Sequence, residues 1–303
     1  MEELRPVIKG LAATLTKLNR IVISITSDLP LIVPMMSIRT IVGVFLAVVM
    51  SAQFAKAELP AEIAVGEILE GWRDDGRHYA ALSIRLAPGW KTYWRTPGAA
   101  GIPPVFDWAA SENVADVTVA FPVPAITELN GLRSIGYADQ VVFPLAVRPI
   151  NKEADVYLHG QIRIGVCSEI CVPMEMELVA TLRSTASQRT TAIVHAMRDR
   201  PMTAGEAGVL NVGCEIAPIS DGMRITARVG LPRMGRAEVA VVELADRSIW
   251  ISEPLVQRNG NTLIAEADMV PPNAQPFLLS RNDVRITLFG GGHAVDIQGC
   301  GQS

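Results

Sequence analysis

Two cysteines four positions apart are the most reactive side chains that this 303-residue sequence places close together. Cys167 and Cys171 lie between two apolar runs typical of β-strands, residues 156–166 and 172–182. If these strands form a hairpin, its loop is Ser168-Glu169-Ile170 and the cysteines face each other. Cross-strand Cβ atoms lie about 4.5–5.5 Å apart, close to the roughly 3.5–4.5 Å that a disulfide needs. The spacing therefore predicts a disulfide at the tip of a hairpin.

A disulfide in this position favours thiol–disulfide exchange. Exposed disulfides tend to be labile rather than structural, and so short a loop restricts the unfolded chain little. Two alternatives stay open: a purely structural disulfide, and a Cu(I) site that the cysteines form with Met174 and Met176. The motif contains no histidine, and the second pair of ligands usual for zinc is missing. We therefore assign no metal site.

In the loop and in the strand that follows it, the charged residues near the pair are Glu169, Glu175 and Glu177. Neighbouring carboxylates disfavour a thiolate. From the local sequence alone we expect no cation beside the pair and no strongly acidic cysteine.

Composition excludes several classes of function. Hydrophobic residues make up 49% of the chain and charged residues 19%, which is typical of a folded protein. The formal net charge is −4 and no basic stripe occurs, so nucleic acid is not an expected partner. The four histidines are dispersed, and no nucleotide-binding loop or Ser-His-Asp signature is present. No cofactor is predicted.

The N-terminal region is typical of an export signal. Arg39 supplies a basic start, residues 41–50 are apolar, and Ala55-Lys56-Ala57 provides the small residues of a cleavage site. We expect cleavage after Ala57, translation that truly starts near Met36, and export to an oxidising compartment. An uncleaved signal anchor is the alternative, although the apolar run is short for a membrane span.

The remainder predicts an all-β fold, with two immunoglobulin-like β-sandwich domains joined by a short helical linker. Short strand-like runs separated by Pro, Gly, Asn or Asp recur in residues 58–182 and 209–303. Residues 183–208 form the expected linker, with helical spacing before Pro201. Within the first domain, residues 121–141 are expected to be a long connecting loop. The Trp and Tyr side chains of this domain are expected to serve mainly as packing.

The second domain contains the other two cysteines. Cys214 lies in its first predicted strand and Cys300 just past its last. First and last strands are often neighbours in such sandwiches, so we predict a structural disulfide, which could contribute about 4–5 kcal/mol. Two free thiols are the alternative, disfavoured after export.

Four motifs in the first domain, in this order, resemble one known family. They are TYWRTPGAAGIPPVFDW (residues 92–108), FPVP (121–124), GYADQVVFPLAV (136–147) and GVCSEICVP (165–173). Together they resemble the periplasmic N-terminal domain of DsbD/ScsB-type protein-disulfide reductases, over roughly residues 59–181. The cysteine spacing is tighter than in the best-known DsbD proteins and suits the ScsB-like branch.

The resemblance implies a function. Cys167 and Cys171 would relay reducing equivalents from a membrane-embedded electron donor of the DsbD/CcdA type to periplasmic thioredoxin-fold proteins, and Cys171 would attack the partner's disulfide. A cap loop would shield the pair, at residues 121–141, with Phe121 and Tyr137 as the shielding side chains.

The chain ends at Ser303 without a membrane segment or a thioredoxin-like CxxC motif. We therefore expect a component of a disulfide reductase rather than a complete enzyme, with electrons supplied by a separate protein. A copper-binding or copper-tolerance carrier, or a non-catalytic β-sandwich interaction protein, is the alternative.

Overall fold

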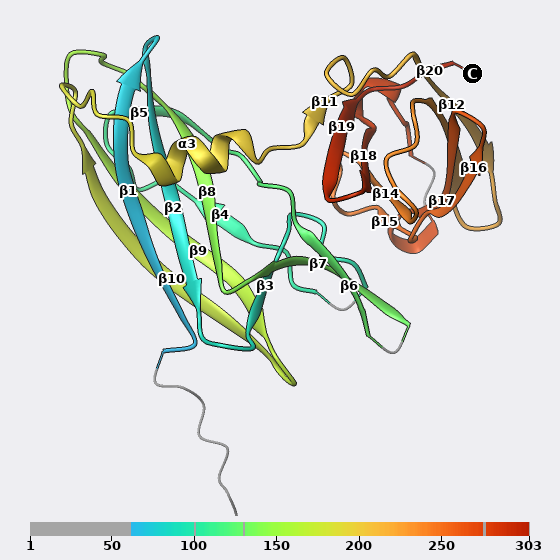
Figure 1. The fold of residues 1–303 in the computed structure, drawn as a ribbon, viewed down its shortest axis with the longest axis horizontal. Helices are drawn as coiled ribbons and strands as arrows, with labels where there is room; N and C mark the ends of the chain where they lie inside the picture. Colours follow the sequence, from blue (N-terminus) through green and yellow to red (C-terminus); the bar gives the residue numbers. More distant parts are fainter. Residues whose placement is uncertain (1–61, 100, 130, 275–276, 303) are drawn as a thin grey trace, which may run out of the picture. The chain divides into compact units, whose positions relative to one another are not determined.

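The computed structural model describes residues 62–99, 101–129, 131–274 and 277–302. These residues are almost entirely strands and their connections, arranged as two β-sandwiches within one compact unit, Leu59–Ser303 (Figure 1). The prediction of an all-β, immunoglobulin-like fold is confirmed. The predicted export signal lies outside the described residues. Within the described part of the chain, no helix has the length and apolar character needed to cross a membrane.

Two sheets face each other in the first sandwich. One has the strand order β1-β2-β8-β5; the other has the order β10-β9-β3-β7-β6, with β4 also paired to β9. The strands are β1 (Ala64–Asp74), β2 (Arg77–Leu86), β3 (Lys91–Tyr93), β4 (Val105–Asp107), β5 (Val114–Val119), β6 (Ala125–Leu129), β7 (Leu132–Ala138), β8 (Gln140–Pro149), β9 (Val156–Cys167) and β10 (Cys171–Leu182).

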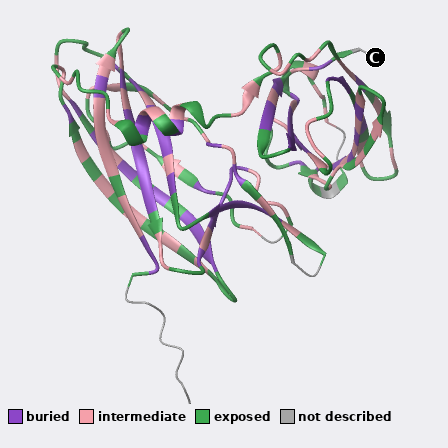
Figure 2. Ribbon diagram, viewed as in Figure 1, coloured by how far each residue is buried: buried purple, intermediate pink, exposed green. Residues whose placement is uncertain are grey.

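The core of this sandwich follows from the two-residue period of its strands. In β9 the side chains of Val156, Leu158, Ile162 and Ile164 are almost fully buried, and exposed or half-buried side chains separate them. Figure 2 shows bands of different burial along the strands of this sandwich. Alternate side chains of a strand point to opposite faces. Phe143 of β8 lies fully buried in the same core. The buried face therefore sets which residues of β9 can face outward.

Strands β9 and β10 form the hairpin that carries the cysteine pair. Their register runs without interruption from Val156 opposite Leu182 to Cys167 opposite Cys171. The backbone N–H of Ser168 donates a hydrogen bond to the Ile170 carbonyl, 3.0 Å away, which closes the loop. The long regular ladder thus holds both cysteines directly opposite each other.

The expectation of a long loop at residues 121–141 is wrong. Most of this segment forms the hairpin of β6 and β7, with Leu129 paired to Leu132. Asn130-Gly131 separates the two strands, and Asn-Gly is the strongest short-range signal for a two-residue hairpin. Gly131 has a φ of 78°, which glycine adopts at little cost.

The linker contains helix α3 (Thr191–Arg198), as its apolar spacing predicts. Ile193 of α3 is fully buried against Trp72 and Ala81, so the helix covers part of the β1-β2-β8 sheet. Met202–Thr203, which the sequence had suggested was linker, forms strand β11 and pairs with β19 of the second sandwich.

The second sandwich also has two sheets, in the orders β11-β19-β18-β14 and β15-β17-β13-β12-β20, with β16 paired to β17. Its further elements are β12 (Asn211–Pro218), β13 (Met223–Gly230), β14 (Glu238–Glu243), β15 (Trp250–Ile251), β16 (Leu255–Asn259), β17 (Thr262–Val270), the 3-10 helices η1 (Pro272–Ala274) and η2 (Arg281–Asp283), β18 (Arg285–Gly290), β19 (His293–Gln298) and β20 (Gly301–Gln302).

A disulfide joins Cys214 of β12 to Cys300, which directly precedes β20. Both residues are buried in the core of the second sandwich. The short parallel pairing of β12 with β20 brings the first long strand of this sandwich beside the chain's last one. The bond therefore closes a loop that spans nearly the whole second sandwich.

Removal of this disulfide should reduce stability much more than removal of the hairpin disulfide. A Cys214→Ala/Cys300→Ala variant should lose about 4–5 kcal/mol of unfolding free energy, because the bond closes a long loop. Cys167→Ala/Cys171→Ala is the matched control and should lose about 2 kcal/mol, since its loop is very short. Urea unfolding of the mature protein measures both. Equal losses, or the reverse order, would contradict this assignment.

Candidate active site

The two cysteines of the hairpin disulfide differ sharply in exposure. Cys167 and Cys171 are bonded, and their Cα atoms lie 4.1 Å apart. Cys167 is only 1% exposed, whereas Cys171 is exposed. Cys171 is therefore the more accessible residue of the pair, and Cys167 is the protected one.

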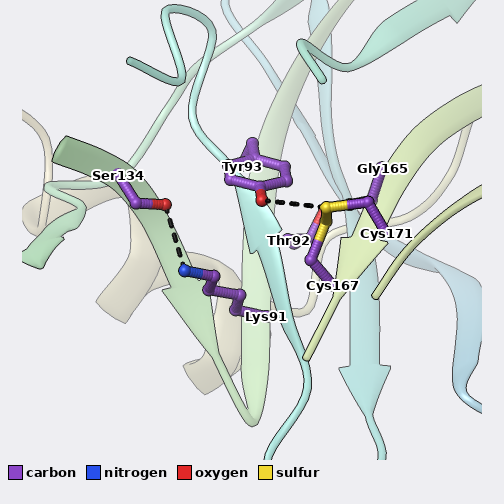
Figure 3. The surroundings of a disulfide bond; sticks show 7 residues. All are labelled: Lys91, Thr92, Tyr93, Ser134, Gly165, Cys167 and Cys171. Atoms are coloured by element: carbon purple, nitrogen blue, oxygen red, sulfur yellow. Dashed lines mark hydrogen bonds between the residues drawn. A yellow bond between two sulfur atoms is a disulfide. The ribbon is translucent and has the colours of Figure 1, made fainter. Parts of the chain in front are cut away.

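A cation lies on the strand beside Cys167. Lys91 of β3 is the direct cross-strand neighbour of Cys167, so their side chains project from the same face of the sheet. The Lys91 ammonium donates a hydrogen bond to the Ser134 hydroxyl, 3.2 Å away, on the next strand (Figure 3). A nearby positive charge favours a thiolate over a thiol. The local sequence places no cation beside the pair, but the pairing of β3 with β9 brings Lys91 next to Cys167. The expectation of no cation beside the pair is therefore wrong in the folded protein.

Two of the three nearby carboxylates have basic neighbours. Glu175 is paired in register with Arg163. Glu177 contacts the His159 ring at 2.8 Å. Glu169 lies in the exposed loop, where water screens its charge. In the folded protein these carboxylates therefore disfavour a cysteine thiolate less than the local sequence suggests.

Tyr93 contacts the disulfide directly. Its hydroxyl lies 3.7 Å from the sulfur of Cys171 (Figure 3). A disulfide sulfur carries no hydrogen, so the tyrosine must donate. Burial raises the pKa of Tyr93, although a hydrogen bond with Ser134 acts in the opposite direction. The hydroxyl thus stays protonated near neutral pH and remains a donor.

Residues just before β4 cover this corner of the sheet. A Cβ atom placed on Gly101 would lie 2.7 Å and 2.8 Å from two carbons of the Tyr93 ring. A Cβ atom placed on Gly165 would lie 2.6 Å from the Cβ of Ile102. Both glycines are needed because the covering chain approaches so closely. Ile102 therefore lies over Gly165, two positions before Cys167.

The structure places the predicted shielding residues elsewhere. Tyr137 is paired with Thr92, one residue from Lys91, so its side chain projects from the opposite face to Cys167. Its hydroxyl donates to the Pro122 carbonyl, 2.8 Å away, and its ring packs against Phe143 in the core. Phe121 also packs against Phe143. The expectation that Phe121 and Tyr137 cover the disulfide is therefore corrected.

Tyr93 is the contact that sequence reasoning missed. The sequence placed it in an aromatic cluster, which is usually packing. Only the pairing of β3 with β9, across more than seventy intervening residues, brings it to the disulfide. The proline- and glycine-rich run that follows Tyr93 was the available signal for a segment that turns back over it.

The methionines considered for copper do not face the cysteines. Residues 172, 174 and 176 pack toward the core, while Cys171 and Glu175 project from the outer face. Met176 lies against Gly66 of the facing sheet. One ion could not be bound by Cys171 and by either methionine without a change in the strand.

Comparisons with known proteins find a family match in the first sandwich. Residues 63–183 match the family model described as thiol:disulfide interchange protein DsbD, N-terminal. These residues therefore form a DsbD/ScsB-type N-terminal domain, a member of the thiol–disulfide exchange family.

A solved structure extends the likeness in fold. The crystal structure of the N-terminal periplasmic domain of ScsB from Proteus mirabilis is similar with a TM-score of 0.58 and 21% sequence identity. The likeness covers 79% of this chain and 92% of that one, so it reaches into the second sandwich. No curated protein matches the chain.

Loss of the Tyr93 hydroxyl should make the Cys171 thiol less acidic. In a Cys167→Ser background, Tyr93→Phe should raise the pKa of Cys171 by up to about one unit, because a net hydrogen bond of about 0.5–1.5 kcal/mol to the thiolate is lost. The pH dependence of alkylation by iodoacetamide measures this pKa. Tyr157→Phe, at the exposed far end of β9, is the control. An unchanged pKa in Tyr93→Phe would show that the contact does not act on the thiolate.

Proposed function

We propose that this protein is a periplasmic thiol–disulfide exchange module. It relays reducing equivalents through Cys167 and Cys171, from a membrane-embedded dithiol donor of the DsbD/CcdA type to periplasmic thioredoxin-fold proteins. It acts as a component of a disulfide reductase.

One observation carries the proposal: the hairpin disulfide joins an exposed residue, Cys171, to a buried one, Cys167. A structural disulfide gains nothing from an exposed sulfur at a loop tip, and an exposed disulfide is open to exchange. The family match at residues 63–183 supports the same role. The ScsB domain of known structure is described as periplasmic, which supports the proposed location together with the export signal predicted before Glu58.

The reaction balances in two displacements. The Cys171 thiolate attacks one sulfur of the partner's disulfide, so a mixed disulfide forms and one partner thiolate leaves. The Cys167 thiolate then attacks the Cys171 sulfur, and the second partner thiolate leaves. The partner gains two electrons, and two protons complete its thiols. The Cys167–Cys171 disulfide is left oxidised and is reduced again by the donor's dithiol.

The surrounding side chains suit these steps. Tyr93 donates toward the Cys171 sulfur and would stabilise the attacking thiolate. Lys91, opposite Cys167, would stabilise the thiolate that resolves the mixed disulfide. Because the resolving residue Cys167 is buried, its thiolate can attack only the neighbouring sulfur of Cys171. This limits side reactions with other thiols.

A trapping experiment tests this function. Cys167→Ser removes the resolving thiol, so the mixed disulfide with a periplasmic thioredoxin-fold partner should accumulate when the exported protein is expressed. It should disappear on addition of dithiothreitol. Non-reducing electrophoresis and mass spectrometry identify the partner and the linking cysteine.

Cys171→Ser is the matched control and should trap far less, because its remaining thiol is buried. Equal trapping by both variants would contradict the assigned roles. Absence of any mixed disulfide, combined with tight Cu(I) binding by the reduced pair, would favour a copper carrier instead.

A further inference from the structure

Strand β3 is followed by a short segment that contacts the second sandwich. Trp94, Arg95 and Thr96 come directly after Tyr93, the last residue of β3. The backbone N–H of Trp94 donates to the Ile135 carbonyl, 3.0 Å away, which keeps the segment against β7. The fully buried Trp94 ring meets Phe289 of β18 edge-on, with 5.3 Å between ring centroids. The chain that carries Tyr93 is therefore packed against β18 one residue later.

Glu243, at the end of β14, binds this segment through two residues. The Arg95 Nε donates to both carboxylate oxygens at 3.0 Å, and the Thr96 hydroxyl donates to Oε1 at 2.6 Å. The Arg95 guanidinium also donates to the Thr287 hydroxyl at 2.9 Å and lies 3.9 Å from the centre of the Trp94 ring. Charge-assisted hydrogen bonds of this kind are among the strongest in proteins and have fixed geometry.

The ion pair is enclosed by protein. The side chain of Arg95 is 6% exposed and that of Glu243 is 14% exposed. Because little water reaches the pair, its geometry is held more firmly than that of a surface ion pair. Neither residue forms a hydrogen bond or ion pair with the disulfide in the described part of the chain, so an effect on the site would have to pass through the segment that follows β3.

We propose that Glu243 is a positioning residue for the disulfide site. By holding Arg95 and Thr96, it fixes the end of β3 and keeps the Tyr93 hydroxyl against the Cys171 sulfur. The second sandwich thereby tunes the reactivity of a cysteine pair that lies entirely in the first.

This inference concerns the site of the proposed exchange function. It rests on that function only in taking the reactivity of Cys171 to serve exchange. Its test measures the acidity of Cys171 with a small alkylating reagent and requires no protein partner. Failure of the trapping experiment and failure of this test are therefore distinguishable.

The test is the pH dependence of alkylation of Cys171 in the mature protein carrying Cys167→Ser. Glu243→Ala should raise the Cys171 pKa, in the same direction as Tyr93→Phe and by no more. Loss of a carboxylate acting through space would instead lower the thiol pKa. An upward shift therefore separates loss of positioning from a direct charge effect. In the Tyr93→Phe background, Glu243→Ala should cause no further rise.

Glu253→Ala is the matched control. Glu253 also pairs across the two sandwiches, with Arg133 at 3.5 Å, but its side chain is 43% exposed. It should leave the Cys171 pKa unchanged. An unchanged or lowered pKa in folded Glu243→Ala would overturn the proposal, as would an equal rise with or without the Tyr93 hydroxyl. If Glu243→Ala does not fold, Thr96→Val and Glu243→Gln are judged by the same outcomes.

Discussion

The register of strand β9 is the constraint on which the site depends. Its last residue, Cys167, is paired with Cys171 on one side and with Lys91 on the other. A slip of one residue would turn Cys167 toward the core and Ile164 toward solvent. Such a slip is costly because β9 buries several aliphatic side chains almost completely. The hydrophobic core of the first sandwich therefore also places the chemistry.

This constraint gives the two cysteines different roles. Both project from the outer face at the hairpin tip, but only Cys167 is buried, with a paired strand on each side of it. Tyr93 then adds a hydrogen-bond donor at the exposed sulfur. The exposure of Cys171 determines which cysteine meets a partner, and we propose that Tyr93 and Lys91 favour the thiolate forms. The second disulfide, Cys214–Cys300, is buried in another core and closes a long loop, which suits stabilisation rather than exchange.

The sequence predicted the parts of this arrangement that depend on residues close together in the chain. The cysteine hairpin needs only two alternating runs and a three-residue loop, and the all-β fold follows from frequent short strands. Asn130-Gly131 is an equally local signal for the β6–β7 hairpin, although the prolines and glycines of residues 121–141 favour a loop. Lys91, Tyr93 and Glu243 were beyond such reasoning, because sheet pairing and contacts between distant strands bring them to the site. A resemblance in motifs also indicated a cap at residues 121–141, whereas residue parity along β7 turns Tyr137 into the core.

The reduction potentials of the two disulfides test the central claim most directly. The mature protein is equilibrated in thiol–disulfide buffers, and differential alkylation with mass spectrometry reports each pair separately. Cys167–Cys171 should titrate as a reversible two-electron couple between about −120 and −270 mV, as exchange proteins do. Cys214–Cys300 should stay oxidised at all potentials down to about −300 mV, as structural disulfides do. Resistance of Cys167–Cys171 to reduction at the same potentials as Cys214–Cys300 would contradict the account.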